Sequence, residues 1–169
     1  MSTLADARPS LAERAASSPG DLLEQIAREY AVSTFDVVRS LPPAQATLAP
    51  GEVFADIMQD IATWGDVLFL VHNADLVLEC TGALPPGSFG HGYFNIHGDS
   101  PIGGHIKADN CKSIAFVVRG LKRIGMSIQF YNAAGEAMFK IFVRRDAARE
   151  LVPEQVQRFQ ALRSRYAPA

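Results

Sequence analysis

The sequence predicts an α+β fold in which an antiparallel β-sheet is flanked by helices at both ends of the chain. Apolar residues recur at helical spacing before residue 65 and again near the C-terminus. Short β-rich runs fill most of the region between them, and tight turns join several of these runs. Strands do not alternate with helices, so a parallel βαβ arrangement is not expected.

The chain of 169 residues has about the size of one domain. Residues 1–19 are rich in Ala, Ser, Arg and Pro and lack a sustained apolar stripe, so we expect a flexible N-terminal arm or a frayed helix there. We expect residues 20–169 to form a single domain. We find no secretory apolar segment and no apolar run of about 18 residues, and expect a cytoplasmic protein without membrane insertion.

Three helices are expected before residue 65. Asp21 can cap the first, and Ser33 can cap the second, which ends at Pro42. Residues 52–64 place apolar side chains on one helical face, and Gly65 ends this helix.

The first two helices resemble a helix-turn-helix, but the second offers few of the Arg, Lys, Asn and Gln side chains that contact base edges. The net charge of -2 adds no general attraction for nucleic acid or anionic membranes. A DNA-binding regulator is therefore the weakest of the alternatives, and no nucleic acid partner is expected.

The β-rich region begins with a hairpin. Residues 66–72 and 76–81 alternate as strands do, and an Asn-Ala-Asp turn joins them. Residues 84–88 are expected to form a loop, and Asp146 to cap a final helix. The remaining strand-like runs are 105–108, 113–119, 126–132 and 137–144.

The sequence does not show the motifs of several common enzymes. It has no GxSxG elbow, no P-loop and no dinucleotide fingerprint that precedes a helix. Cys80 and Cys111 do not have zinc-site spacing, so we expect two reduced thiols packed in the core.

The histidines remain as the chemically distinctive residues. Residues 91–115 hold three of the four histidines and four of the thirteen glycines, and glycine at this density permits close approach of a ligand to the backbone. His72 ends a very apolar strand. We expect His72 and His105 to face one flat, apolar, metal-bearing ligand.

Haem is one ligand of this kind, because neutral imidazole is a good axial ligand for its iron. A haem also needs an apolar slot and cations for its propionates. Tyr93 and Tyr131 are alternative iron-binding groups. Possible walls are Phe89, Tyr93, Phe94, Ile96, Ile102, Ile106, Phe116 and Phe130, and possible propionate partners are Lys107, Lys112, Arg119 and Lys140.

Four segments carry a family resemblance: TWGDVLFLVHNADLVLE, LPPGSFGHGYFNIHG, GGHIKADNCKSIAFV and QFYNAAGEAMFKIFVRRD. Over residues 20–162 the chain resembles the intracellular haem-utilisation carriers, the HutX/ChuX-like family. The resemblance implies a HemS/ChuX-like fold, similar to one half of the HemS-like haem proteins, and a homodimer.

The resemblance also implies that His72, in VHNAD, and His105, in GHIKADNC, bind the haem iron. We therefore expect a haem site formed by His72, His105, Lys107, Phe116 and Arg119, with the two histidines as metal ligands. His91 is treated as structural or as a support for the ligands, and Tyr131 stands where the family pattern has Phe.

The expected function is that of a carrier, which takes up imported haem and passes it to a haem-degrading or haem-storing acceptor protein. A haem-degrading or haem-reducing enzyme is the main alternative, and it would need an open iron position and a source of electrons. Two histidine ligands disfavour oxygen activation, and the sequence has no flavin or nicotinamide motif.

Overall fold

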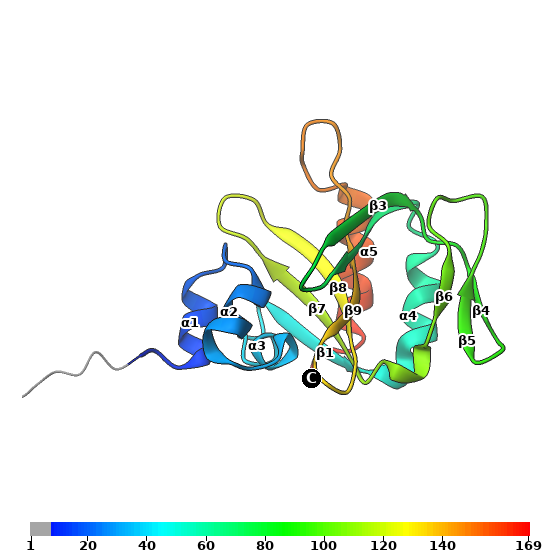
Figure 1. The fold of residues 1–169 in the computed structure, drawn as a ribbon. Coiled ribbons are helices and arrows are strands. Elements are labelled where there is room, and N and C mark those ends of the chain that lie inside the picture. Colours follow the sequence, from blue (N-terminus) through cyan, green and yellow to red (C-terminus); the bar gives the residue numbers. More distant parts are fainter. Residues whose placement is uncertain (1–7) are drawn as a thin grey trace, which may run out of the picture.

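A six-stranded antiparallel sheet forms the centre of the molecule, as the computed structural model of residues 8–169 shows (Figure 1). Its strand order is β1-β7-β8-β9-β2-β3, and a smaller sheet has the order β4-β5-β6. The predicted α+β class is thus confirmed. The helices are α1 Leu11–Ser17, α2 Leu23–Tyr30, α3 Thr34–Arg39, α4 Phe54–Ile61 and α5 Pro153–Ser164. The strands are β1 Ala46–Pro50, β2 Asp66–His72, β3 Val77–Ala83, β4 Gly87–Gly90, β5 Tyr93–Ile96, β6 Gly104–Ile106, β7 Ser113–Arg119, β8 Gly125–Tyr131 and β9 Ala137–Phe142.

The two faces of the large sheet carry different layers. Helices α1–α3 cover one face, whereas α4, α5 and the small sheet lie against the other (Figure 1). Strand β7 shows how the sequence divides between them, because side chains alternate along a strand. Ile114 and Phe116 belong to the core beneath α4 and α5, and Ala115 and Val117 to the core beneath α1–α3.

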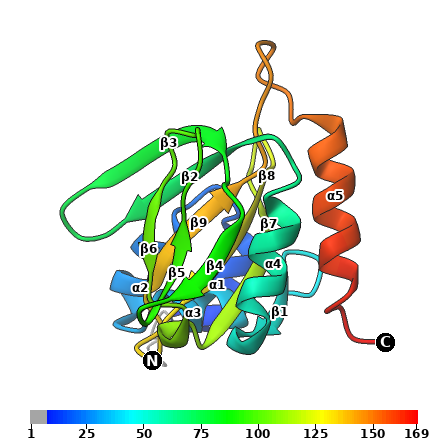
Figure 2. The same cartoon turned by 90° about the vertical axis from the view of Figure 1, so that its right-hand side faces the viewer.

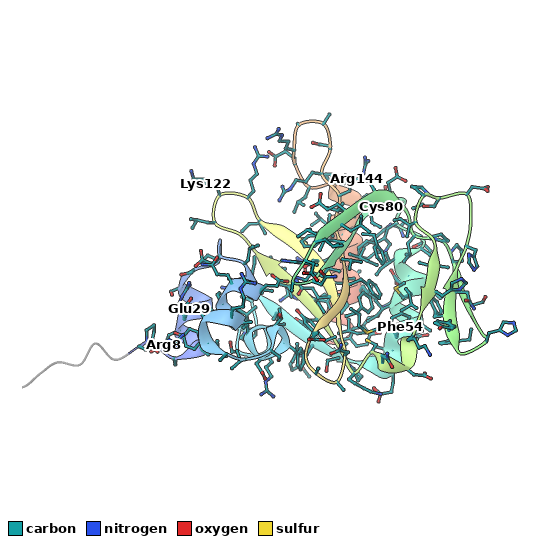
Figure 3. All side chains as sticks on the ribbon, viewed as in Figure 1. Arg8, Glu29, Phe54, Cys80, Lys122 and Arg144 are labelled. Atoms are coloured by element: carbon teal, nitrogen blue, oxygen red, sulfur yellow. The ribbon has the colours of Figure 1, made fainter. Side chains whose placement is uncertain are left out.

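Phe54 of α4 lies at the centre of the larger core, between the two sheets (Figure 3). Its ring centroid lies 5.3 Å from that of Phe94 in the small sheet, and 5.4 Å from that of Phe130 in the large sheet. Both contacts have the edge-to-face geometry that aromatic pairs prefer. This cluster attaches the small sheet to the large one.

The N-terminal segment differs from the expected arm of residues 1–19. Residues 1–7 lie outside the described part of the chain, but Leu11–Ser17 forms a helix with a capping box between Ser10 and Glu13. Ala15 is fully buried, and Arg14 pairs with Asp21 at 2.8 Å. The segment lacks a sustained apolar stripe, and its helix is instead stabilised by the capping box and by burial of Ala15.

Two other expectations were wrong. No strand was expected before residue 66, yet β1 lies there and is paired with β7, far later in the chain. Strand β4 begins inside the expected loop 84–88 and pairs with β5, the next strand along the chain. The final helix does not begin at Asp146 but at Pro153. Proline is tolerated in the first turn of a helix, because the backbone N–H that it lacks would have no acceptor within the helix. Asp146 instead accepts a hydrogen bond from Glu150 N in the loop before this helix.

Both cysteines are free thiols, as expected. Cys111 is buried, and desolvation raises the pKa of its thiol to about 11. Cys80 is partly exposed on β3. In residues 8–169, no helix is long and apolar enough to cross a membrane.

Candidate functional site

His72 ends β2, and its side chain lies on the sheet face that carries α1–α3. It shares this face with Leu70, two residues earlier, whose register partner on β9 is Lys140. Lys140 in turn pairs with Glu24 of α2. The His72 side chain is 19% exposed, so its ring is largely covered but can still be reached.

A groove of about 780 Å³ opens beside His72, bordered by α2, α3 and the turns after β2 and β8. This volume is typical of sites for small molecules and cofactors. Arg28 of α2 also lines the groove and offers a cation to an acidic ligand group. Its apolar lining consists of small side chains: Ala27, Ala31, Val32, Ala74, Ala134 and Ala137.

The carboxylate of Glu24 connects His72 to Lys140. Glu24 Oε1 lies 3.4 Å from His72 Nδ1 and also contacts Lys140 Nζ. Burial opposes ionisation of Glu24, but Lys140, a backbone hydrogen bond and His72 outweigh it, so the pKa of Glu24 lies below its ordinary value. Glu24 therefore faces His72 as an anion. Lys140, expected to pair with a propionate, is only 6% exposed and is committed to Glu24.

His105 lies on β6, on the outer surface of the small sheet. Its register partner on β5 is Asn95, whose neighbours Phe94 and Ile96 are buried against the large sheet. Asn95 and His105 therefore point the other way, because side chains alternate across a strand. Nδ1 of His105 lies 2.6 Å from Asn95 Oδ1, which leaves Nε2 as the ring nitrogen available to a ligand.

Aromatic and cationic side chains surround His105 on this outer surface. The ring centroids of His97 and Tyr93 lie 5.1 Å and 5.8 Å from that of His105. Lys107 Nζ lies 4.8 Å from the centroid of the Tyr93 ring, which is a cation–π contact. The structure thus brings Lys107 close to His105, and Tyr93 lies there as well.

His72 and His105 do not meet within one chain. His72 contacts α2, whereas His105 is exposed on the outer surface of β6, and these two elements lie on opposite sides of the large sheet (Figure 1). The aromatic core and the small sheet fill the space between. The expectation that both histidines face one ligand is therefore not met by a single chain.

Phe116 and Arg119 were expected in the site, and the structure places both elsewhere. Phe116 is fully buried, with its ring centroid 5.7 Å from that of Phe159, so it has no surface to offer a ligand. Arg119 donates to the backbone oxygens of Ala15 and Ser18, at 2.8 and 2.9 Å. The buried Phe116 ring and the hydrogen-bonded Arg119 guanidinium therefore stabilise the fold.

Tyr131, an alternative iron-binding group, is also a core residue. It is fully buried, donates to Gln129 Oε1, and desolvation raises the pKa of its phenol well above the ordinary value. A tyrosinate ligand at this position is therefore disfavoured.

Gly104, beside His105, has a φ of +150°, which alanine adopts only with strain.

Sequence reasoning missed three residues around the histidines: Glu24, Arg28 and Asn95. Glu24 and Arg28 belong to a helix that was interpreted only through its apolar face, and charged residues on such a helix usually face water. Asn95 alternates with two buried residues on β5, which was a usable signal for an outward-facing side chain.

The fold, the groove at His72 and the outer surface at His105 define an α+β ligand-binding protein with histidines at its accessible surfaces. The chain belongs to the haem utilisation ChuX/HutX family, whose pattern matches residues 47–162. This confirms the resemblance seen in the sequence. The intracellular heme transport protein HutX of Vibrio cholerae is 31% identical over 166 residues, which cover 97% of this chain and 86% of that protein.

Solved structures agree with this assignment. A protein from Erwinia carotovora is 45% identical with a TM-score of 0.91, covering 94% of this chain and 99% of the other. The heme-binding protein ChuX is 41% identical with a TM-score of 0.86, covering 92% and 98%. The E. coli heme oxygenase ChuS, at 14% identity and a TM-score of 0.74, shares the fold, and this chain spans 50% of its length.

Proposed function

We propose that this protein is a cytoplasmic haem carrier that receives imported haem and passes it to a haem-degrading or haem-storing acceptor. One observation carries the proposal: in a chain of the haem-utilisation family, His72 and His105 each have Nδ1 next to an acceptor oxygen. The other ring nitrogen, Nε2, is then the one that can bind iron.

The surroundings of each histidine suit one part of a haem. The small alanine side chains of the groove beside His72 leave room for a flat macrocycle, and Arg28 can pair with a propionate. At His105, Tyr93 offers an aromatic edge and Lys107 a second cation. Together, the two surfaces offer the histidine ligands, the apolar and aromatic contacts and the cations that a haem requires.

We further propose a homodimer in which His72 of one chain and His105 of its partner approach the same haem. The placement of these histidines on opposite sides of one chain supports this arrangement. The β2–β3 hairpin projects from the sheet (Figure 2) and exposes three apolar side chains by 50–60%: Leu76 in its turn, and Val77 and Leu78 on the edge strand β3. Symmetric pairing is a common way to cover such an edge.

Two histidine ligands would leave no open coordination position on the iron, which favours transfer of haem over oxygen activation. The test incubates haem-loaded protein with a reductant, oxygen and catalase, and separately with an excess of apomyoglobin. A carrier retains its haem chemically intact in the first mixture and loses it to apomyoglobin in the second. Catalytic formation of a biliverdin-like product would identify a haem-degrading enzyme instead.

A further inference from the structure

Three elements meet at one oxygen atom next to the groove. Glu24 Oε1, from α2, contacts Lys140 Nζ of β9 and lies 3.4 Å from Nδ1 of His72 at the end of β2. The side chains of Glu24 and Lys140 are only 15% and 6% exposed. Charged groups this deep interact strongly, because little water screens them.

The hydrogen-bonding chemistry of Glu24 and Lys140 favours a proton on Nδ1 of the His72 imidazole. A carboxylate can only accept hydrogen bonds, and an ammonium can only donate them. The histidine nitrogen that faces Glu24 is therefore best protonated. In a neutral imidazole this places the lone pair on Nε2, the nitrogen that a metal binds.

Lys140 keeps the carboxylate in place. Its strand position opposite Leu70 is set by the sheet register, and its ammonium holds Oε1 of Glu24 on the helix side of the sheet. At 3.4 Å the distance from Oε1 to His72 Nδ1 is that of an ion pair, slightly longer than an ordinary hydrogen bond. Binding of a cation at Nε2 increases the positive charge at Nδ1–H, which strengthens its attraction to the carboxylate.

We propose that Glu24 is a positioning residue for His72, which orients the imidazole through Nδ1 and makes it a stronger ligand for ferric than for ferrous haem. This inference rests on the proposed function, because it assumes that His72 binds the iron. Ferric iron carries one more positive charge than ferrous iron, so a nearby carboxylate stabilises it more. Lys140 offsets part of this charge, which reduces the size of the effect.

The first experiment needs no haem. Nitrogen chemical shifts of the His72 ring, measured by NMR at about pH 8 where an ordinary histidine is neutral, report which nitrogen carries the proton. Wild-type protein should show predominantly protonated Nδ1. Glu24→Gln retains an acceptor oxygen and should keep this tautomer, whereas Glu24→Ala should give a mixture.

Glu24→Ala leaves Lys140 buried without its partner, so a Glu24→Ala/Lys140→Met double variant guards against loss of folding. The same mixture of tautomers is expected in that variant. Unchanged protonation of Nδ1 in both the single and the double variant would overturn the inference.

The second experiment measures the midpoint potential of the haem-loaded protein. Glu24→Gln should change the ratio of ferric to ferrous affinity by about threefold to tenfold, which raises the potential by roughly 30–59 mV for a one-electron couple. Glu79→Gln is the matched control, because Glu79 lies opposite Leu70 on the same sheet face and is exposed. It should leave the potential nearly unchanged.

The outcomes separate this inference from the proposed function. If His72→Ala shifts the Soret band but Glu24→Gln leaves the potential at the wild-type value, the role of Glu24 is wrong and the haem ligand stands. If His72→Ala itself leaves the haem spectrum unchanged, both the ligand assignment and the role of Glu24 are overturned. A Glu79→Gln shift as large as that of Glu24→Gln would also refute a specific contact.

Discussion

The side-chain oxygen of Asn95 lies 2.6 Å from Nδ1 of His105, and the amide nitrogen of the same Asn95 donates to the backbone oxygen of Gly90 at 3.1 Å. Because the amide nitrogen faces a carbonyl, its oxygen must face the imidazole, and His105 must be the donor. Asn95 therefore does for His105, with a neutral amide, what Glu24 does for His72 with a charge.

Asn95→Ala should weaken haem binding by roughly 10- to 100-fold, because residues that orient a metal ligand typically have effects of this size. A hemin titration monitored at the Soret band measures this. Asn110 is an exposed asparagine in the short 3-10 helix after β6, and Asn110→Ala should bind haem as wild type does. Wild-type affinity in the Asn95 variant would show that the tautomer of His105 does not matter for binding.

Complementing variants should reveal the shared site in the dimer. A mixed dimer of one His72→Ala chain and one His105→Ala chain contains one interface with both histidines and one with neither. We expect it to bind half the wild-type amount of haem with the wild-type Soret maximum. Differently tagged chains allow the mixed dimer to be purified. Spectra equal to the average of the two single variants would argue against a shared site, as would a monomer by light scattering.

Tyr131→Phe should leave the haem spectrum unchanged, since the phenol is fully buried and donates its hydrogen bond to Gln129. It should cost about 1–2 kcal/mol of stability, because Gln129 loses its hydrogen-bond donor inside the core. Denaturant unfolding measures the loss. A shift of the Soret band in this variant would restore tyrosine as an iron ligand.

The stability difference between wild type and Tyr131→Phe should also depend on pH. Burial raises the pKa of Tyr131 above its ordinary value of 10.0, so the unfolded chain releases this proton at a lower pH than the folded one. The contribution of Tyr131 is complete below about pH 10 and is lost as the pH rises further. The difference should therefore shrink between pH 9 and pH 11, and a constant difference would contradict the assigned environment.

Gly87→Ala should destabilise the small sheet. A methyl group at Gly87 would lie 2.0 Å from the ring of Phe94, and overpacking of this kind typically costs about 1–3 kcal/mol. Gly125→Ala is the control, because its nearest contact would be an ordinary 3.5 Å to the oxygen of Arg119. Equal stability of the two variants, measured by denaturant unfolding, would mean that β4 does not pack as described.

Local sequence patterns predicted the elements that are stabilised by nearby residues. The β2–β3 hairpin is an example: the Asn73 side chain accepts hydrogen bonds from Asp75 N and Leu76 N, and so closes the turn. Strand β1 could not be read in this way. It is five residues long, ends in proline, and is held by β7, which lies more than sixty residues later in the chain.

The sequence identified single residues of the site but not how they are arranged in space. The motifs around His72 and His105 identified both histidines, but the side of the molecule each one faces depends on strand order and on how the two sheets stack. Lys140 shows the same limit: its charge made it a candidate for haem propionates, whereas its strand register directs it to Glu24 of a helix 116 residues away in sequence.

A hemin titration of wild type, His72→Ala, His105→Ala and the double variant tests the haem-carrier account most directly. We expect one haem per chain in the wild type. Each single variant should show a shifted Soret band and roughly 100-fold weaker binding, at the upper end of the effect of losing an orienting residue. The double variant should retain only weak, non-coordinated binding. Unchanged Soret spectra and affinities in all three variants would contradict haem binding through His72 and His105.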